Sequence, residues 1–199
     1  MYALVESGSI TKHLNGNKSI TIGDVVHSRR IFTLWTEAER NAIGIYTIIF
    51  DDSNKKDRKW YNNTSQSFAF ANNKVTATYG SATARAHADA NATDADGNDL
   101  DPVVVIPGLK TNLIKKIKKL AYDELARTDW YITRKAEKST AIPSAITTHR
   151  NLVRSRQAAA ITSITNASDT PALETLYTYT TNDSGVTSRP LAEIPTLYL

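Results

Sequence analysis

An amphipathic stretch at residues 109–166 constrains the fold of this chain more than any other part of the sequence. In its first half, apolar residues recur at intervals of three and four, which predicts a helix from about residue 111 to residue 127. Pro107 and Gly108 prevent this helix from beginning earlier. Its predicted inner face has one polar member, Glu124, among apolar neighbours: Leu113, Ile114, Ile117, Leu120, Ala121 and Leu125.

The second half of the stretch predicts another helix, which begins at Pro143-Ser144. Its inner face is expected to contain Ile146, Val153, Ala160, Ile161 and Ile164. The residues between the two helices, with Trp130, Tyr131 and Ile132, are interpreted as a linker that returns the chain through residues 138–140. Two amphipathic helices with a short connection pack against each other, so we expect an antiparallel α-helical hairpin at residues 108–168.

Residues 1–80 predict a small antiparallel β domain with a short helix. Strand-like runs occupy residues 2–5, 19–22, 45–50, 60–70 and 74–79, and Asn15-Gly16-Asn17 and Asn72-Asn73 favour hairpin turns. Thr36 and Glu39 have the spacing of a capping box, which predicts where the helix begins, and Gly44 is expected to follow its end. With the helices that follow, this β-rich part indicates an α+β fold.

Two acidic flanks surround the basic helical stretch. The formal charge is +4 for the whole chain, +8 for residues 108–168, −4 for residues 81–107 and −3 for residues 169–199. Residues 81–107 are interpreted as an acidic linker or loop, with a short strand or extended segment at residues 103–106. Residues 169–199 predict a short helix with Thr170 as its N-cap and Pro171 at its first position, a turn at residues 182–185 and an extended tail.

The sequence contains few features that support chemistry. It has no cysteine, which excludes disulfides and thiolate metal sites, and no apolar run of about 18 residues. Its first residues do not resemble a signal peptide. The acidic run that begins at Asp94 lacks the glycine and the last carboxylate of a calcium loop, and the four histidines are widely spaced. Without a nucleophile elbow or a nucleotide-binding motif, we expect no catalytic residues, no cofactor, no metal and no small-molecule substrate.

The lysine pairs at residues 115–116 and 118–119 have two interpretations. Such lysines can neutralise phosphates and bind nucleic acid. They are also ordinary on the solvated face of an amphipathic helix. Aromatic residues that stack on bases do not interleave with this lysine run, so the solvated face is favoured and a nucleic-acid-binding protein is the weaker alternative.

Two segments of the sequence resemble a known family. The first is residues 31–45, which include Trp35, Thr36, Glu37, Ala42, Gly44 and Ile45. The second contains Leu125, Thr128, Asp129, Trp130, Tyr131, Arg134, Ile142, Pro143, Arg150, Val153 and Arg154. Both resemble segments of bacteriophage tail-fibre assembly proteins, or tail-fibre chaperones, and they occur in that family's order. With their spacers they cover residues 1–166, whereas the insert at 81–101 and the tail after residue 170 depart from the family pattern.

The resemblance implies a non-enzymatic assembly chaperone or adaptor that binds a trimeric phage tail fibre. It implies action in the host cytoplasm during assembly, and in some relatives a place on the virion tail. The alternative is a permanent virion structural protein of the baseplate or of the fibre-attachment region, with a baseplate protein as partner. Neither reading involves nucleic acid or a membrane.

Four residues are candidates for partner binding: Trp35, Trp130, Tyr131 and Arg134. Trp, Tyr and Arg dominate the binding energy of protein interfaces. The other interpretation of the aromatic residues is that each packs in the core of its own subdomain. A second candidate contact is an edge strand at residues 2–5 or 74–79, which would extend the sheet of the fibre by main-chain hydrogen bonds.

Overall fold

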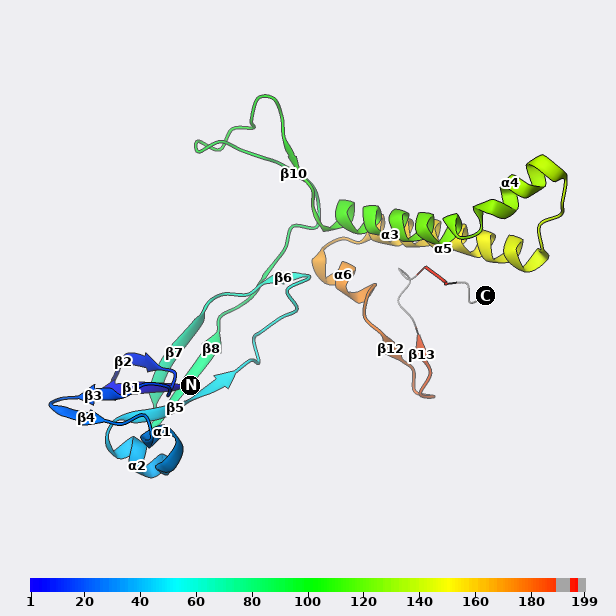
Figure 1. Cartoon of the computed structure of the whole chain (residues 1–199). Coiled ribbons are helices and arrows are strands. Elements are labelled where there is room, and N and C mark those ends of the chain that lie inside the picture. Colours follow the sequence, from blue (N-terminus) through cyan, green and yellow to red (C-terminus); the bar gives the residue numbers. More distant parts are fainter. Residues whose placement is uncertain (189–193, 197–199) are drawn as a thin grey trace. The chain divides into compact units, whose positions relative to one another are not determined.

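The computed structural model describes residues 1–188 and 194–196 and has a mixed α+β fold, as the sequence predicts (Figure 1). The chain forms two compact units, Met1–Thr83 and Ala84–Leu199. The extended tail predicted for the end of the chain lies, apart from residues 194–196, outside the described residues. Each unit has its own architecture.

A five-stranded sheet with the order β2-β1-β5-β8-β7 forms the centre of the first unit. The strands are β1 (Tyr2–Glu6), β2 (Ser9–Leu14), β5 (Ile45–Asp51), β7 (Gln66–Ala71) and β8 (Lys74–Tyr79). The prediction of a wholly antiparallel sheet is wrong in one pair, because β5 and β8 run parallel. The chain crosses over after β5, forms β7 and turns back through Asn72-Asn73, so that β8 pairs with β5 in the same direction.

The strand order also corrects the two edge strands expected from the sequence. The runs at residues 2–5 and 74–79 belong to β1 and β8, which lie inside the sheet. The outer strands are β2 and β7, and the sheet curls so that the rings of His13 and Phe68 approach to 4.2 Å between centroids. The edges of β1 and β8 are therefore already paired and do not accept another strand.

The sheet carries apolar clusters on both faces. Successive residues of a strand point to opposite faces, and in β1 the buried Ala3 belongs to one cluster while the buried Leu4 belongs to the other. The Leu4 cluster also contains Ile20, Ile31, Phe32 and Ile45, and the Ala3 cluster contains Ile48, Val75 and Ala77.

Short elements complete the first unit. They are β3 (Ile20–Ile22), β4 (Val25–His27), α1 (Ile31–Leu34), α2 (Glu37–Ala42) and β6 (Tyr61–Asn62). The predicted capping box is confirmed: Glu39 N–H donates to Thr36 Oγ1 at 3.3 Å, and Thr36 N–H donates to the Glu39 carboxylate at 2.7 Å. The backbone and side-chain hydrogen bonds from Thr36 lower the pKa of Glu39. Gly44 follows the helix at φ +81°, where a Cβ would lie 2.6 Å from the carbonyl oxygen of Val5.

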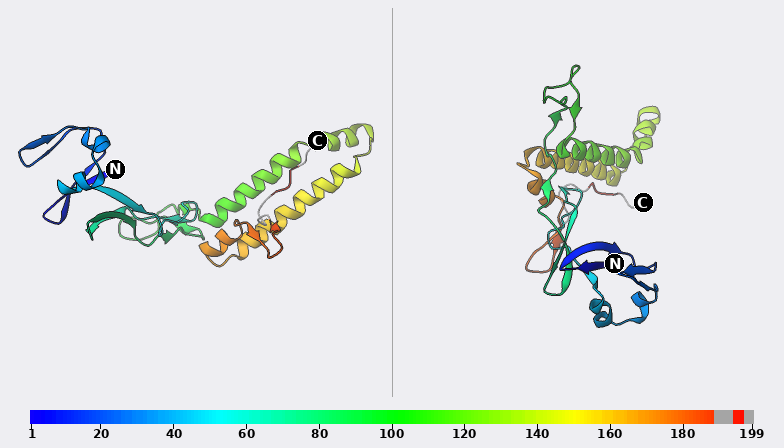
Figure 2. Two further views of the ribbon diagram at one scale, coloured as in Figure 1. Left: turned by 90° about the horizontal axis from the view of Figure 1, so that it is seen from below. Right: turned by 90° about the vertical axis from the view of Figure 1, so that its left-hand side faces the viewer.

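Two long helices organise the second unit. They are α3 (Leu109–Ala126) and α5 (Ser144–Asn166), each close to its predicted limits, and they lie side by side in both views of Figure 2. Their contact buries Leu113, Ile117 and Ala121 of α3 and Ile146, Val153, Ala160 and Ile164 of α5. Leu120 was also predicted to face inward but is 42% exposed, because it lies to one side of the row that faces α5.

The predicted linker between these helices is instead largely helical. It forms α4 (Asp129–Lys138), with Asp129 as an acidic residue in its first turn. The helix ends at Ser139, which has φ +55° and whose N–H donates to the carbonyl of Lys135. Trp130, Tyr131 and Ile132 therefore lie on a helix and not in an extended connection.

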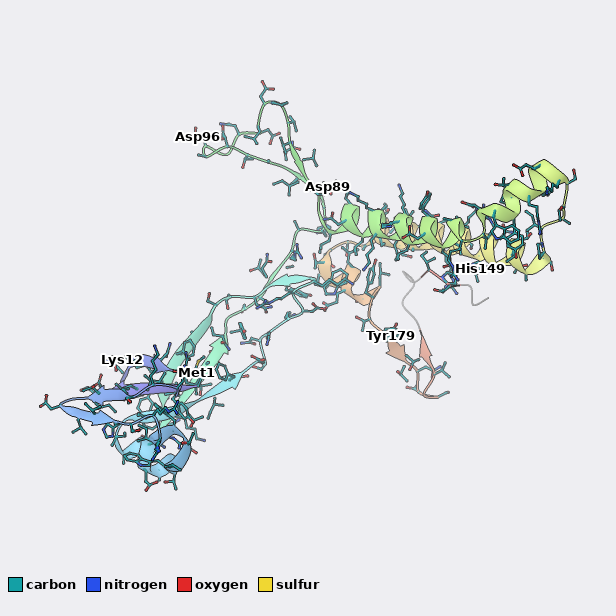
Figure 3. The ribbon with its side chains drawn as sticks, in the orientation of Figure 1. Met1, Lys12, Asp89, Asp96, His149 and Tyr179 are labelled. Carbon is teal, nitrogen blue, oxygen red and sulfur yellow. The ribbon has the colours of Figure 1, made fainter. Side chains whose placement is uncertain are left out.

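The acidic segment, predicted as a loop, contains regular structure. After β9 (Thr83–Ala84), strand β10 (Ala90–Asn91) pairs antiparallel with β11 (Val105–Ile106). Ala92 N–H extends the ladder to the carbonyl of Val104 at 2.7 Å. We refer to residues 89–108 as the arm; it leaves the N-terminal end of α3, with Asp89 at its base and Asp96 near its tip (Figure 3).

A short helix and a hairpin follow α5. Helix α6 (Thr170–Thr175) is capped by Asp169 and not by Thr170 as predicted, because Ala172 N–H donates to Asp169 Oδ1 at 2.8 Å. Thr170 is buried and donates to the carbonyl of Arg85 at 2.6 Å. The predicted turn at residues 182–185 is confirmed between β12 (Thr180–Thr181) and β13 (Thr187–Ser188).

We expect the contact of α3 with α5 to contribute most of the stability of the second unit. Ile117→Ala should lower the free energy of unfolding by about 2–5 kcal/mol, because it removes buried apolar atoms and leaves a cavity. Lys118→Ala, at the exposed neighbouring position, should change it by less than about 0.5 kcal/mol. Urea unfolding followed by helical circular dichroism measures both variants, and equal midpoints would contradict this packing.

Candidate functional site

The junction of α3, α4 and α5 contains most of the polar residues that are buried in this structure. Glu124, Thr128, His149 and Arg150 are each at most 8% exposed. Several of the residues that carry the family resemblance lie here, including Leu125, Thr128, Asp129, Trp130 and Arg150. Buried polar groups destabilise a fold unless they are hydrogen-bonded, so their pairing decides whether the junction can form.

Glu124 connects α3 to α5. Its Oε1 lies 2.9 Å from Nε2 of His149, and its Oε2 accepts a hydrogen bond from Arg127 at 3.0 Å. The one polar residue in the predicted inner face of the first helix therefore has a matching polar residue on the second. This pairing explains how a carboxylate is accommodated among apolar side chains.

Arg150 connects α5 to the start of α4. Its Nη1 donates to the carbonyl of Leu125 at 2.8 Å and to Thr128 Oγ1 at 2.7 Å, and lies 2.9 Å from Asp129 Oδ1. The guanidinium thus contacts the C-terminal end of α3, the residue between the helices and the first residue of α4. The first residue of α4 is therefore joined to α5 by this side chain.

The outer surface of α4 carries an aromatic–arginine cluster, which we define as Trp130, Tyr131 and Arg134. The two rings lie 3.8 Å apart between centroids, at an interplanar angle of 32°. The guanidinium of Arg134 lies 4.7 Å from the centroid of Trp130 and 5.3 Å from that of Tyr131, within cation–π distance. Trp130 is 51% exposed and the adjacent Ile132 is 43% exposed. A large, partly exposed and preorganised surface of this composition suits protein–protein contact.

The fourth candidate residue, Trp35, is not part of this cluster. It lies in the first unit, packs against the buried cluster of Leu4 and Phe32, and makes an edge contact with the ring of His27 at 5.9 Å. Its packing matches the second interpretation of the aromatic residues, in which they stabilise their own subdomain. Three of the four candidates are therefore brought together, and Trp35 is not.

Sequence reasoning did not identify the network that supports the cluster. Glu124 was visible as a polar residue in an apolar face, but nothing in the sequence indicated that His149 would face it. Arg150 and Asp129 lie in the segments that carry the resemblance, yet their ion pair depends on how α4 and α5 meet.

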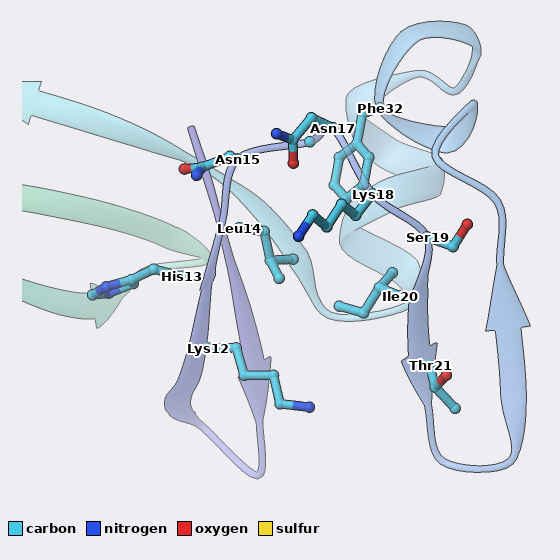
Figure 4. Close-up of a pocket in the computed structure, with 11 residues that line it drawn as sticks. Lys12, His13, Leu14, Asn15, Asn17, Lys18, Ser19, Ile20, Thr21 and Phe32 are labelled. Atoms are coloured by element: carbon cyan, nitrogen blue, oxygen red, sulfur yellow. The ribbon is translucent and has the colours of Figure 1, made fainter.

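The first unit contains a surface hollow of about 500 Å³ (Figure 4). It is lined by residues 12–21, which comprise the end of β2, the connection to β3 and the start of β3, and by Phe32. Leu14, Lys18 and Ile20 point into the space between these strands, and the lining has two lysines but no carboxylate. We assign no reaction to this hollow.

Residues 1–188 and 194–196 contain no group of three or more His, Asp or Glu side chains that could hold a metal ion. No helix within this described part is long and apolar enough to cross a bilayer. Comparisons with protein-family profiles, with curated protein sequences and with solved structures gave no match.

The buried hydrogen bonds of Thr128 should contribute to the stability of the second unit. Thr128→Val keeps the shape of the side chain but removes the hydroxyl that accepts from Arg150 and donates to Leu125, so it should destabilise the second unit by about 1–3 kcal/mol. Thr133→Val, at an exposed position of α4, is the matched control and should have little effect. Chemical unfolding measures both, and equal stability of the two variants would show that the network is not formed.

Proposed function

We propose that this protein is a bacteriophage tail-fibre assembly chaperone or adaptor, which binds a trimeric tail fibre in the host cytoplasm. The observation that supports it best is the exposed aromatic–arginine cluster on α4, held by the buried network around Arg150. The identity of the partner comes from the resemblance of the two sequence segments to tail-fibre assembly proteins. No step of this function requires a nucleophile, a metal or a nucleotide.

The proposal includes a two-part layout, a β-rich unit followed by an antiparallel helical hairpin that presents the cluster. Contacts at both ends of the long helices support the hairpin. Lys110 near the start of α3 donates to the carbonyl of Thr165 near the end of α5, at 2.9 Å. Glu124 near the end of α3 pairs with His149 near the start of α5. Helix α4 lies in the connection between these two helices and carries the proposed docking residues.

The physical reason for such a partner is the state of a fibre chain before it assembles. A chain that has not yet formed its trimer exposes unpaired strand edges and apolar surface, and both promote aggregation. The exposed ring of Trp130 and the half-buried ring of Tyr131 offer apolar surface that can cover such a chain at low cost in side-chain entropy. Arg134 can add hydrogen bonds to exposed carbonyl groups at the same place.

The function is tested by producing the cognate fibre with and without this protein and measuring soluble, heat-resistant trimer. The proposal predicts more trimer in its presence and a complex that co-purifies at physiological salt. If the fibre trimerises equally well alone and no complex forms, the assembly function is contradicted. Fixed copy number in purified virions would instead identify a permanent structural protein of the baseplate or fibre-attachment region.

The docking surface makes a separate prediction. Trp130→Ala should weaken fibre binding about thirty-fold, equivalent to about 2 kcal/mol, because the ring is a central anchor of the cluster. Tyr179→Ala, which also removes an exposed aromatic ring of the second unit, is the control and should bind normally. Calorimetric titration gives both dissociation constants. Equal affinity of the two variants would exclude the cluster as the contact surface.

A further inference from the structure

Hydrogen bonds fix the base of the arm to the start of α3. At its base, Gly108 N–H donates to Asp89 Oδ1 and Thr111 donates to Asp89 Oδ2, both at 2.8 Å. Two further backbone hydrogen bonds of 3.0 Å join Leu109 and Lys110 to the carbonyls of residues 86 and 87. A Cβ at position 108 would lie 2.2 Å from the carbonyl oxygen of Ala88, so the chain can pass this closely only because the residue is glycine.

The tip of the arm is also ordered by its own hydrogen bonds. The N–H groups of Asp96 and Asn98 both donate to Asp94 Oδ1 at 2.9 Å, and the Asn91 amide donates to Asp99 at 2.7 Å. Backbone hydrogen bonds to the carboxylate, chiefly from Asn98, lower the pKa of Asp94. The arm therefore has a defined shape from base to tip.

Four consecutive apolar residues of the arm are exposed. Val103, Val104, Val105 and Ile106 are 60%, 49%, 55% and 55% exposed. Neighbouring side chains in an extended chain point to opposite sides, so both faces of the β10–β11 ladder are open. Exposed apolar surface of this kind on a projecting pair of strands is typical of an interaction site.

The charge around this apolar strand restricts what can cover it. Asp94, Asp96, Asp99 and Asp101 surround the tip, and the formal charge of residues 81–107 is −4. A surface that fits the arm therefore needs apolar or aromatic contacts together with positive charge.

The outward face of α3 has this composition. Lys115, Lys118 and Tyr122 follow at intervals of three and four, so they share one face of the helix. Both lysines are exposed, and Tyr122 is 71% exposed. The adjacent Lys119 holds Asp123 at 2.8 Å on the same exposed side. The arm contains five aspartates and no lysine or arginine, whereas this face of α3 presents exposed lysines, so the two surfaces of this chain are complementary in charge.

We propose that the arm of one copy of this protein docks on the outward face of α3 of a second copy. Within one chain the arm extends away from the N-terminal end of α3, and both surfaces remain exposed (Figures 1 and 3). The contact joins two different surfaces, so each copy can give its arm to one neighbour and receive the arm of another. Such a head-to-tail contact forms a closed ring or a filament. It uses neither Trp130 nor the fibre, so it does not depend on the proposed function.

Light scattering coupled to size-exclusion chromatography tests the association with the full chain alone. We expect the wild type to have a mass of at least twice the 21.9 kDa of one chain. Val103→Thr/Val105→Thr keeps the shape of the arm but removes apolar contacts, and should shift the protein to the monomer mass. Lys115→Glu/Lys118→Glu should do the same by removing the complementary charge. Leu152→Ser, at a 44% exposed apolar position on α5, is the control and should keep the wild-type mass.

A charge exchange between two variants provides the sharper test. Asp96→Lys/Asp101→Lys on the arm and Lys115→Glu/Lys118→Glu on α3 should each be monomeric alone. Mixing them should restore the higher mass, because each arm then meets an α3 face of opposite charge. A wild type that is monomeric at all concentrations would overturn the proposal, as would variants that keep the wild-type mass or a mixture that stays monomeric. Loss of DNA retention in the α3 variant with unchanged mass would also overturn it and assign this face to nucleic acid.

Discussion

The arrangement of α3, α4 and α5 in the second unit depends on the contacts that the guanidinium of Arg150 makes. Moving a charged group out of water costs free energy, which is compensated only when its hydrogen bonds are made inside the protein. Arg150 meets the end of α3, Thr128 and the first residue of α4 at once, and Glu124 with His149 adds a second buried pair beside it. A packing that buried Arg150 away from Leu125, Thr128 and Asp129 would lose these three contacts. The network therefore favours one arrangement over others more than it adds stability, and this arrangement places Trp130 at the surface.

The second unit presents two surfaces of different chemistry. The cluster on α4 is aromatic and cationic, whereas the arm is apolar and acidic. Surfaces that differ in this way select different partners, because a charge pattern that attracts one partner repels the other. In our account the cluster binds the fibre and the arm binds a second copy of the chain. Neither role uses a catalytic group, and the buried polar residues of the junction connect α3, α5 and the first residue of α4.

Local patterns in the sequence predicted the elements that depend on local forces. The apolar spacing that includes Leu113 and Ile117 located α3, and Thr36 with Glu39 located the start of α2. Other features depend on contacts between distant residues and were missed. Strand β1 lies inside the sheet because it pairs with both β2 and β5, and β8 lies inside because it pairs in parallel with β5 and antiparallel with β7. Helix α4 is too short to show a clear period, and it begins where Arg150 binds Asp129. The cluster was predicted by residue type alone, so Trp35 was included although it packs against a core.

Hydrogen exchange of this protein with and without its cognate fibre tests the central claim most directly. Binding through the aromatic–arginine cluster predicts slower exchange of the backbone amides of α4, residues 129–138, when the fibre is added. Amides of the first unit remote from any contact should keep their exchange rates and provide an internal reference. Unchanged exchange throughout α4 in a sample where the fibre is bound, with protection at another surface, would contradict the account.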